Sequence, residues 1–338
     1  MIISRTPHRI SFFGGGTDYP PYYLEHGGKV LGTAIDKYCY INVRKFPPFF
    51  EHKHRIVYSK FENINELHEI QHPSVRETLK YLKTDYGISI HHDGDIPARS
   101  GMGSSSAFTV GLLNSMMALD GQMISKKELA NKAIHIEQKL IKENVGSQDQ
   151  TFAAYGGLNL IEFTTTGEIT VNPIIIKPER LQKFESKLLL VFTGLSRLSS
   201  EIADEQVKNT KKNLDDLHKM KQLVDDAHAI LTNPQKDLLE FGEMLNETWK
   251  LKRGLSSKIA TDEIDEMYDL ALKNGAVGGK LLGAGGGGFM LFYVTQKLRH
   301  KVIAALHNYL HIPFKFDFDG SKIIFYDPNY NGKETRMA

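Results

Sequence analysis

The sequence predicts an α/β protein with two domains, and three observations support this prediction. Segments with a strand pattern alternate with segments of helical period along the whole chain. The length of 338 residues is sufficient for two hydrophobic cores. The alternation also restarts near residue 186. We therefore expect one domain over residues 1–180 and a second domain over residues 181–338.

In the first domain, runs rich in β-branched and aromatic residues predict strands, and apolar residues at helical spacing predict helices. The expected strands are RISFF, GGKVLGTAIDKYCYINVRKF, HRIVYSKF, GISIHH, LNLIEF and EITVNPIII. The expected helices cover residues 64–86, 104–119 and 125–143. The third helix begins at Ser125 with Glu128 three residues further on, which is the pattern of a capping box.

The second domain shows the same alternation with longer helices. Its expected strands are KLLLVFTG and FMLFYV, followed by short strands at the end of the chain. Its expected helices cover residues 199–231, 235–250, 262–274 and 296–309.

The composition excludes several classes of protein. With 41% hydrophobic and 24% charged residues, it is that of an ordinary soluble globular protein. The net charge of +2, without basic blocks, predicts neither nucleic acid nor a membrane as partner. The apolar stretches are too short for a membrane span or a signal peptide, and a single cysteine, Cys39, excludes an intrachain disulfide. We expect a cytoplasmic protein that is a monomer or a homodimer.

The segment RSGMGSSSAFTVG, residues 99–111, places two glycines and three serines directly before an apolar helix. Ser104 or Ser105 is expected to be the N-cap of that helix. Backbone N–H groups at a helix N-terminus and the positive end of the helix dipole favour a bound anion. An ordinary capped helix would show the same pattern, so this segment alone leaves both interpretations open.

Two further glycine-rich turns flank this segment in the sequence. RTPHRISFFGGGTDYP ends a strand with three glycines and then offers the carboxylate of Asp18. GGKLLGAGGGGFMLFY contains a formal GxGxxG at Gly283, Gly285 and Gly288. A dinucleotide-binding fingerprint follows a strand and opens a helix, whereas here the order is inverted, and the Walker and hydrolase-elbow patterns also fail. The three turns therefore indicate a less common nucleotide-dependent enzyme.

Taken together, the three turns resemble the motifs of the GHMP kinases. The phosphate loop of that family, P-x-x-x-G-L-G-S-S-x-A, corresponds to Pro97–Ala107 with Met102 in place of leucine. The N-terminal motif corresponds to Pro7–Asp18 and the C-terminal glycine motif to Lys280–Gly288, so the resemblance covers nearly the whole chain. It implies a mixed α/β N-terminal domain that binds ATP, a ferredoxin-like α+β C-terminal domain, and a kinase that uses ATP and Mg²⁺.

The resemblance also implies roles for individual residues. The triphosphate is expected on the phosphate loop, at Gly101, Met102, Gly103, Ser104, Ser105 and Ser106. Mg²⁺ is expected on Ser105 and Glu137, with Glu143 as the alternative carboxylate. The segment Gly146–Gln150 matches the family pattern G-x-x-D-Q/N and makes Asp149 the catalytic carboxylate. Arg9 is expected opposite Asp149.

The substrate implied by the resemblance is a small sugar. Within the family the sequence is most similar to kinases that phosphorylate C1 of D-glycero-D-manno-heptose 7-phosphate. Asp18, Thr17 and Gly285 are expected beside the sugar. A sugar phosphate would need a cation, and the candidates are Arg197, Lys252 and Arg253. A kinase for a free hexose such as fucose or galactose, and a non-catalytic sugar sensor on the same fold, are the alternatives.

Overall fold

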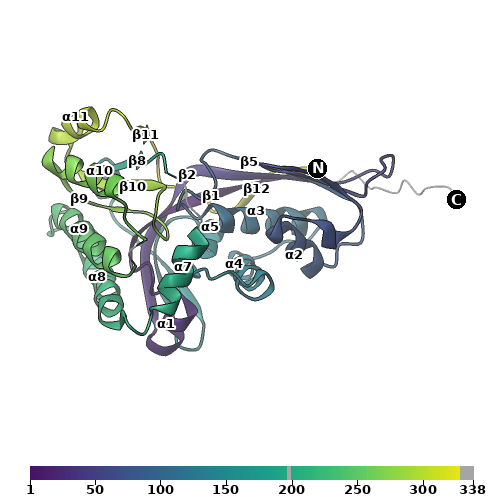
Figure 1. Ribbon diagram of the computed structural model, residues 1–338, viewed down its shortest axis with the longest axis horizontal. Coiled ribbons are helices and arrows are strands. Elements are labelled where there is room, and N and C mark those ends of the chain that lie inside the picture. Colours follow the sequence, from purple (N-terminus) through teal and green to yellow (C-terminus); the bar gives the residue numbers. More distant parts are fainter. Residues whose placement is uncertain (196–198, 257, 328–338) are drawn as a thin grey trace.

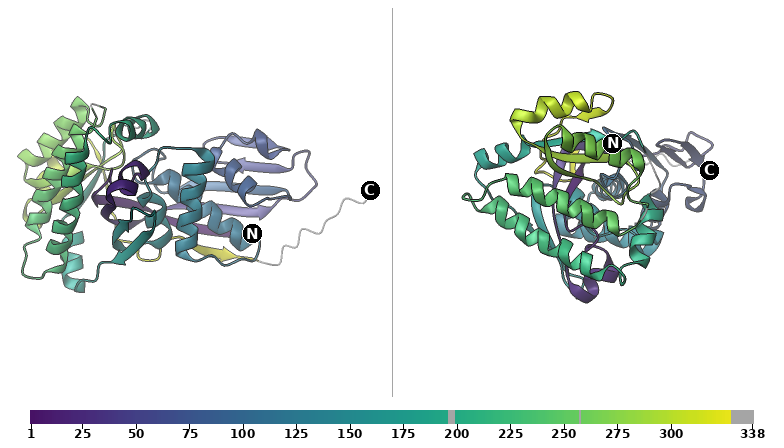
Figure 2. Two further views of the ribbon diagram at one scale, coloured as in Figure 1. Left: turned by 90° about the horizontal axis from the view of Figure 1, so that it is seen from below. Right: turned by 60° about the vertical axis from the view of Figure 1, so that its left-hand side comes forward.

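The computed structural model describes residues 1–195, 199–256 and 258–327, which form two lobes (Figure 1). The elongated sheet of the first lobe and the helices of the second lobe lie at opposite ends of the molecule (Figure 2). Within the described residues, no helix is long and apolar enough to cross a membrane. The mixed α/β architecture predicted from the sequence is confirmed.

The first lobe is built on an eight-stranded sheet. Its strands run in the order β12-β1-β2-β5-β3-β4, and β6 pairs with β2 and with β7. The bounds are β1 Ile2–Phe13, β2 Gly28–Lys45, β3 His54–Val57, β4 Phe61–Ile64, β5 Ile88–Gly94, β6 Leu158–Phe163, β7 Ile169–Pro173 and β12 Lys322–Tyr326. The 18 residues of β2 allow it to pair with β6 through its first half and with β5 through its second.

The helices of the first lobe include the three that the sequence predicts and three that it does not, at residues 20–26, 148–155 and 178–185. They are α1 Pro20–His26, α2 Pro73–Tyr81, α3 Ser104–Leu119, α4 Lys126–His135, a π-helical turn Ile136–Ile141, α5 Gln148–Tyr155 and α6 Pro178–Glu185. The bounds of α3 and the Ser125–Glu128 capping box are confirmed. The helix predicted over residues 64–86 is shorter, because Pro73 fits the first turn of a helix and starts α2 there.

The second lobe has a four-stranded antiparallel sheet in the order β11-β8-β10-β9. Its elements are β8 Leu188–Phe192, α7 Ser199–Lys208, α8 Leu214–Thr232, α9 Leu239–Gly254, α10 Asp262–Lys273, β9 Ala276–Leu281, β10 Phe289–Val294, α11 Gln296–Ala305 and β11 Leu310–Ile312. This order and connectivity are those of a ferredoxin-like fold, as expected. The helix predicted over residues 199–231 is two helices, α7 and α8, and the Thr210 hydroxyl bonds to the Val207 carbonyl (2.9 Å) where α7 ends.

The chain returns to the first lobe at its end, where β12 pairs with β1 and Tyr326 lies opposite Ile2. The division predicted between residues 180 and 181 stays a prediction.

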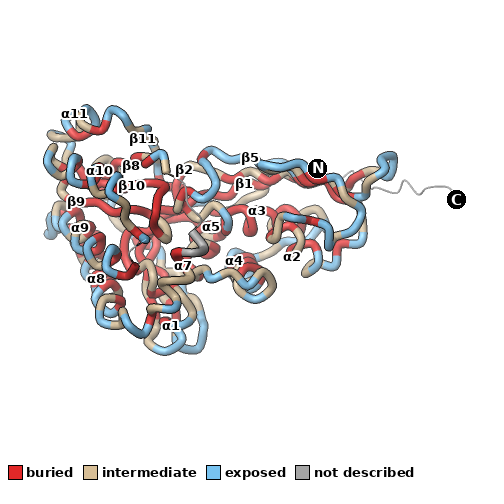
Figure 3. The backbone as a smooth tube through the Cα atoms, in the orientation of Figure 1, coloured by how far each residue is buried: buried red, intermediate tan, exposed pale blue. Residues whose placement is uncertain are grey.

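The two lobes share a hydrophobic core at their junction. Phe12 and Phe13 at the end of β1 pack on Phe241 of α9, with ring centroids 5.4 and 4.9 Å apart. Phe184 of α6 packs on both Phe12 and Phe241. Figure 3 shows buried chain running from the strands of one lobe into those of the other. This shared core fixes the second lobe against the end of β1, where the glycine-rich turns lie.

Candidate active site

The lobes meet around a cavity of about 970 Å³. Its wall contains residues of β1, of the turns after β1 and before α3, of the first turn of α5, of α9 and of the loop after β9. This volume is typical of small-molecule sites. All three glycine-rich turns found in the sequence contribute residues to this one cavity.

The N-terminus of α3 lies in the cavity wall and forms a candidate anion site. Gly101 and Gly103 have φ angles of +75° and +73°, which glycine adopts without strain. α3 begins directly after them, and its first hydrogen bond runs from the Ala107 N–H to the Gly103 carbonyl (2.9 Å). The N–H groups of the first three helical residues therefore have no partner within the helix, and the helix dipole adds a partial positive charge.

The expected serine cap of α3 is wrong. Gly103 is the N-cap residue, because two left-handed glycines lead the chain into the helix without a capping side chain. Ser104 is the first helical residue, and its hydroxyl accepts a hydrogen bond from the Arg99 N–H (3.3 Å). Met102 points into the hydrophobic core, and its carbonyl accepts a hydrogen bond from the Arg9 N–H (3.1 Å).

The third glycine turn packs against the phosphate loop, backbone to backbone. A Cβ on Gly101 would lie 2.6 Å from the Leu282 carbonyl oxygen, and a Cβ on Gly283 would overlap Gly101. The expectation that Gly285 lies beside the substrate is corrected here, because Gly285 packs on Ile259 behind the wall. Gly283 and Ala284 line the cavity instead.

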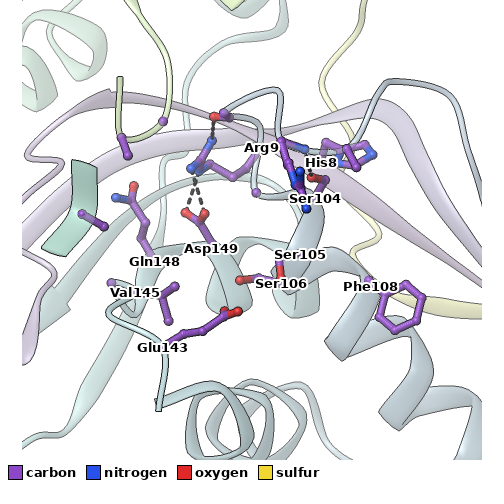
Figure 4. Close-up of a pocket in the computed structure, with 18 of the residues that line it drawn as sticks. His8, Arg9, Ser104, Ser105, Ser106, Phe108, Glu143, Val145, Gln148 and Asp149 are labelled. Atoms are coloured by element: carbon purple, nitrogen blue, oxygen red, sulfur yellow. Dashed lines mark hydrogen bonds and ion pairs between the residues drawn. The ribbon is translucent and has the colours of Figure 1, made fainter. Parts of the chain in front are cut away.

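Arg9 and Asp149 form a bidentate ion pair at this loop. Arg9 Nε and Nη2 donate to the two carboxylate oxygens of Asp149 at 2.7 and 2.8 Å, and Nη1 donates to the Gly101 carbonyl at 2.6 Å. Asp149 stands in the first turn of α5, where the helix dipole favours a carboxylate. A Cβ on Gly103 would lie 3.3 Å from Asp149 Oδ2. The structure thus brings this pair against the N-terminus of α3 (Figure 4).

Asp18 lies in the same wall, whereas Thr17 does not. Asp18 is buried and accepts hydrogen bonds from the N–H groups of Gly16 (3.0 Å) and Gln148 (3.3 Å). Burial, and next the charge of Asp149, raise the pKa of Asp18. The expectation that Thr17 contacts the sugar is corrected, because its buried hydroxyl bonds to the carbonyls of Gly14 and Lys29 within the turn.

Glu137 pairs with Ser106 rather than with Ser105. The Ser106 hydroxyl donates to Glu137 Oε2 (2.8 Å), and the side-chain amide of Gln150 donates to the same oxygen. Successive helical residues point about 100° apart. Ser106 therefore faces the π-helical turn that carries Glu137, while Ser105 is exposed at the cavity. That Ser105 and Glu137 hold a magnesium ion together stays a prediction, because the Ser106 and Gln150 hydrogen bonds occupy only Oε2 of Glu137.

The carboxylates near the serines are partly unsatisfied. Burial raises the pKa of Glu137 to about 7, and its Oε1 has no hydrogen-bond partner among the described residues. Glu143, the alternative carboxylate, lines the cavity, and burial raises its pKa as well. Figure 4 shows the Glu143 side chain directed toward Ser105 and Ser106. Carboxylate and hydroxyl oxygens are the ligands that Mg²⁺ prefers.

The three candidate cations for a sugar phosphate differ in where they lie. Lys252 is buried in the cavity wall, where its Nζ donates to the carbonyls of Leu281 (2.8 Å) and Gly283. Arg253, the next residue, lies at the surface and pairs with Asp265 (2.6 Å), so the expectation that it binds phosphate is corrected. Arg197 lies outside the described residues.

The sequence analysis did not single out Lys280 as a buried cation of the cavity wall. Its Nζ donates to the carbonyls of Ser11 (3.0 Å) and Phe12 (2.8 Å). Burial lowers the pKa of Lys280, and so do the charges of Lys252 and Arg9. The signal was a lysine within the C-terminal glycine motif, in a strand that is otherwise apolar or glycine.

An aromatic wall was also missed. The ring of His72 stacks on Phe108 (4.4 Å between centroids), and the rings of His92 and Tyr58 meet this pair edge-on. All four residues line the cavity. They come from four separate segments of the chain, so no local sequence motif predicts that they meet. Figure 4 shows Phe108 at a distance from Asp149, and flat rings at this end of the cavity suit a nucleotide base.

Comparisons with known proteins agree with this geometry. The family described as GHMP kinases N terminal domain matches residues 73–157, and GHMP kinases C terminal matches residues 223–312. The D-glycero-alpha-D-manno-heptose 7-phosphate kinase of Campylobacter jejuni is 30% identical over 321 residues, which cover 91% of this chain and 93% of that protein.

Two further similarities are more distant. The bifunctional fucokinase/GDP-fucose pyrophosphorylase of Arabidopsis thaliana is 27% identical, and the match covers 87% of this chain but 30% of that longer protein. The crystal structure of a D-glycero-D-manno-heptose 1-phosphate kinase from Bacteroides thetaiotaomicron superposes with a TM-score of 0.78 at 26% identity. That match covers 96% of this chain and 98% of the other.

Proposed function

The chain belongs to the GHMP kinases and is an ATP-dependent sugar kinase, and we propose that it phosphorylates the anomeric C1 hydroxyl of D-glycero-D-manno-heptose 7-phosphate. The product is the 1,7-bisphosphate, made in the cytoplasm toward nucleotide-activated heptose for surface polysaccharide. The observation that carries the chemistry is the Arg9–Asp149 pair at the N-terminus of α3. It places a carboxylate beside an anion site.

In this proposal the triphosphate of ATP binds the backbone N–H groups of the loop from Gly101 to Ser106. The base extends toward the stacked rings of His72 and Phe108, and Figure 4 shows Phe108 on the side of the cavity away from Asp149. Phosphoryl transfer requires mainly positioning and charge complementarity, and a rigid loop with a helix dipole supplies both.

Asp149 accepts the proton of the C1 hydroxyl as the C1 oxygen bonds to the γ-phosphorus. The bond from the γ-phosphorus to the ADP oxygen breaks, and ADP leaves with the electron pair. Arg9 holds both carboxylate oxygens of Asp149 through its planar fork, which fixes their direction. An anomeric hydroxyl is more acidic than an ordinary alcohol, so the demand on this base is modest.

The residues around the serine turn fit a magnesium ion. The partnerless Oε1 of Glu137, the Glu143 carboxylate and the exposed Ser105 hydroxyl are the oxygen ligands that would hold it. When bound, magnesium would neutralise charge on the β- and γ-phosphates. Burial raises the pKa of Glu137 to about 7, and a nearby cation would stabilise its ionised form. This supports Glu137 as a magnesium ligand.

The sugar contacts Asp18 through its hydroxyl groups in this proposal, since a buried carboxylate is a strong acceptor. The similarity to a heptose 7-phosphate kinase over most of both chains supports a phosphorylated heptose as substrate. Similarity to a fucokinase keeps a free hexose as the second candidate. The intact Arg9–Asp149 pair argues against a non-catalytic sensor, which needs no such pair.

The substrate is tested by an ADP-release assay with heptose 7-phosphate, free heptose, fucose and galactose, each with and without magnesium. We expect turnover with heptose 7-phosphate, dependent on magnesium and at least about tenfold above the free sugars in kcat/KM. Turnover of free hexoses alone would overturn the substrate and leave the mechanism standing.

A further inference from the structure

Arg9 and Lys252 each donate a hydrogen bond to one of two glycine-rich turns, the phosphate loop and the turn after β9, at the place where these turns touch. Arg9 Nη1 donates to the carbonyl of Gly101, and Lys252 Nζ donates to the carbonyl of Gly283. Gly101 and Gly283 touch backbone to backbone. Two cations from different lobes, one on β1 and one on α9, therefore meet where the phosphate loop begins.

The charge of Lys252 has no counterion among the described residues. Its side chain is 7% exposed, and its hydrogen bonds go to the carbonyls of Leu281 and Gly283. The titratable groups that act on it electrostatically, Arg9 and Lys280, are both cations. An ammonium group has three N–H donors, so one remains available in the cavity wall. A buried cation of this kind is stabilised by a bound anion.

Two anions of the reaction could meet this cation: the sugar's own phosphate and the phosphoryl group in transfer. Lys252 lies at the Gly101–Gly283 contact, next to the arginine that holds Asp149. The sugar's C7 phosphate would be several bonds away from the C1 oxygen that Asp149 serves. The position of Lys252 therefore favours the transferred group.

We propose that Lys252 is a further catalytic residue, which contacts the γ-phosphoryl group while it passes from ATP to the sugar. The proposal rests on the placement of the triphosphate on the loop from Gly101 to Ser106. Lys252 forms no covalent bond and keeps its proton during the step. From its position on the second lobe, its positive charge stabilises the negative charge on the phosphoryl oxygens. Arg9 does the same from the first lobe.

The first test is Lys252→Met, which removes the charge at similar length. We expect kcat to fall by about 100-fold or more, as for the loss of one preorganised donor to a transition state. The KM values for ATP and sugar should change by less than about threefold. The matched control is Arg253→Met on the same helix, which removes an exposed cation and should leave kcat unchanged. Melting temperatures of both variants verify folding.

The second test is a pH profile, which needs no loss-of-function variant. Burial, and next the charge of Arg9, lower the pKa of Lys252 to about 7. In the wild type, kcat/KM should fall above about pH 7 as Lys252 loses its proton in the free enzyme. In Lys252→Arg this fall should disappear, because a guanidinium stays protonated. A purely structural lysine would not move the profile.

Two results would overturn the proposal. One is a rise in KM for the phosphorylated sugar in Lys252→Met with kcat unchanged, which would assign Lys252 to the sugar's own phosphate. The other is the same pH profile in Lys252→Arg as in the wild type. If the wild type phosphorylates another sugar, the proposed substrate fails, and the Lys252 measurements are made with that sugar.

Discussion

The buried cations of the cavity wall have different partners in the two lobes. The cation of the first lobe lies in an ion pair, whereas the two cations of the second lobe are held by backbone carbonyls. On the first-lobe side, Arg9 is neutralised by both oxygens of Asp149. On the second-lobe side, Lys252 and Lys280 are held by backbone carbonyls, and no carboxylate lies within ion-pair distance among the described residues. Burial lowers the pKa of both lysines.

This difference separates two tasks. The paired wall is complete without substrate, so it fixes the direction of the reacting carboxylate in advance. The unpaired wall carries a desolvation cost that an anionic ligand would relieve. Preorganisation of the reacting carboxylate therefore resides in the first lobe, whereas the second lobe adds cations, unpaired among the described residues, close to the N-terminus of α3.

The largest effect is expected for Asp149→Asn, which removes the proton acceptor from the paired wall. An asparagine fits the same space but cannot take the C1 proton, and the loss of a general base costs about 10²- to 10⁴-fold in rate. We expect kcat to fall within that range while the dissociation constant for ATP stays within about threefold. Single-turnover kinetics and calorimetry measure the two quantities. Near-normal turnover would show that Asp149 only orients the sugar.

A smaller effect is expected for Arg9→Lys, which keeps the charge and removes the fork. A lysine offers a point charge in place of two parallel N–H groups, so it cannot hold both oxygens of Asp149 and the Gly101 carbonyl together. We expect kcat to fall by about 10- to 100-fold, with a smaller change in KM for ATP. The control is Lys29→Arg, at an ion pair with Asp225 that lies outside the cavity wall. Equal loss in both variants would contradict a special role for the fork.

The paired wall was largely predictable from the sequence, because its residues sit in motifs of fixed spacing. Resemblance of Pro7–Asp18 and Gly146–Gln150 to the family patterns led to the Arg9–Asp149 contact that the structure contains. The bounds of α3 followed from its apolar run between turns. The ferredoxin-like order of the second sheet followed from the same resemblance. Local signals sufficed in these cases.

The rest depended on side-chain direction, which the sequence does not contain. Whether Ser105 or Ser106 meets Glu137 depends on which face of α3 is turned toward the π-helical turn, and the bounds of α3 do not determine this. Lys252 and Arg253 are neighbours on one helix, yet one faces the cavity and the other faces Asp265. That choice is made by packing of α9 on the second sheet, which no local pattern encodes.

The smallest effect concerns Glu137, a buried carboxyl group on the first-lobe side, and it extends the comparison to stability. Its pKa is raised from 4.5 to about 7, so the folded state binds a proton that the unfolded chain has already lost between those values. The free energy of unfolding of the ligand-free protein should therefore decrease as pH rises from about 4.5 to about 7. The decrease is on the order of 1 to 3 kcal/mol.

Glu137→Gln removes this titration and should flatten that part of the stability curve. Urea unfolding of the wild type and of Glu137→Gln between pH 5 and pH 8 measures the difference. Glu143→Gln is the comparison variant. The charge of Glu143 is the smallest contribution to the raised pKa of Glu137, so most of the decrease should remain in this variant. Magnesium should restore stability at pH 8 in the wild type but not in Glu137→Gln, since a bound cation favours the ionised carboxylate. If magnesium stabilised both proteins equally and Glu143→Gln abolished the gain, Glu143 would be the metal ligand and Glu137 an internal partner of Ser106.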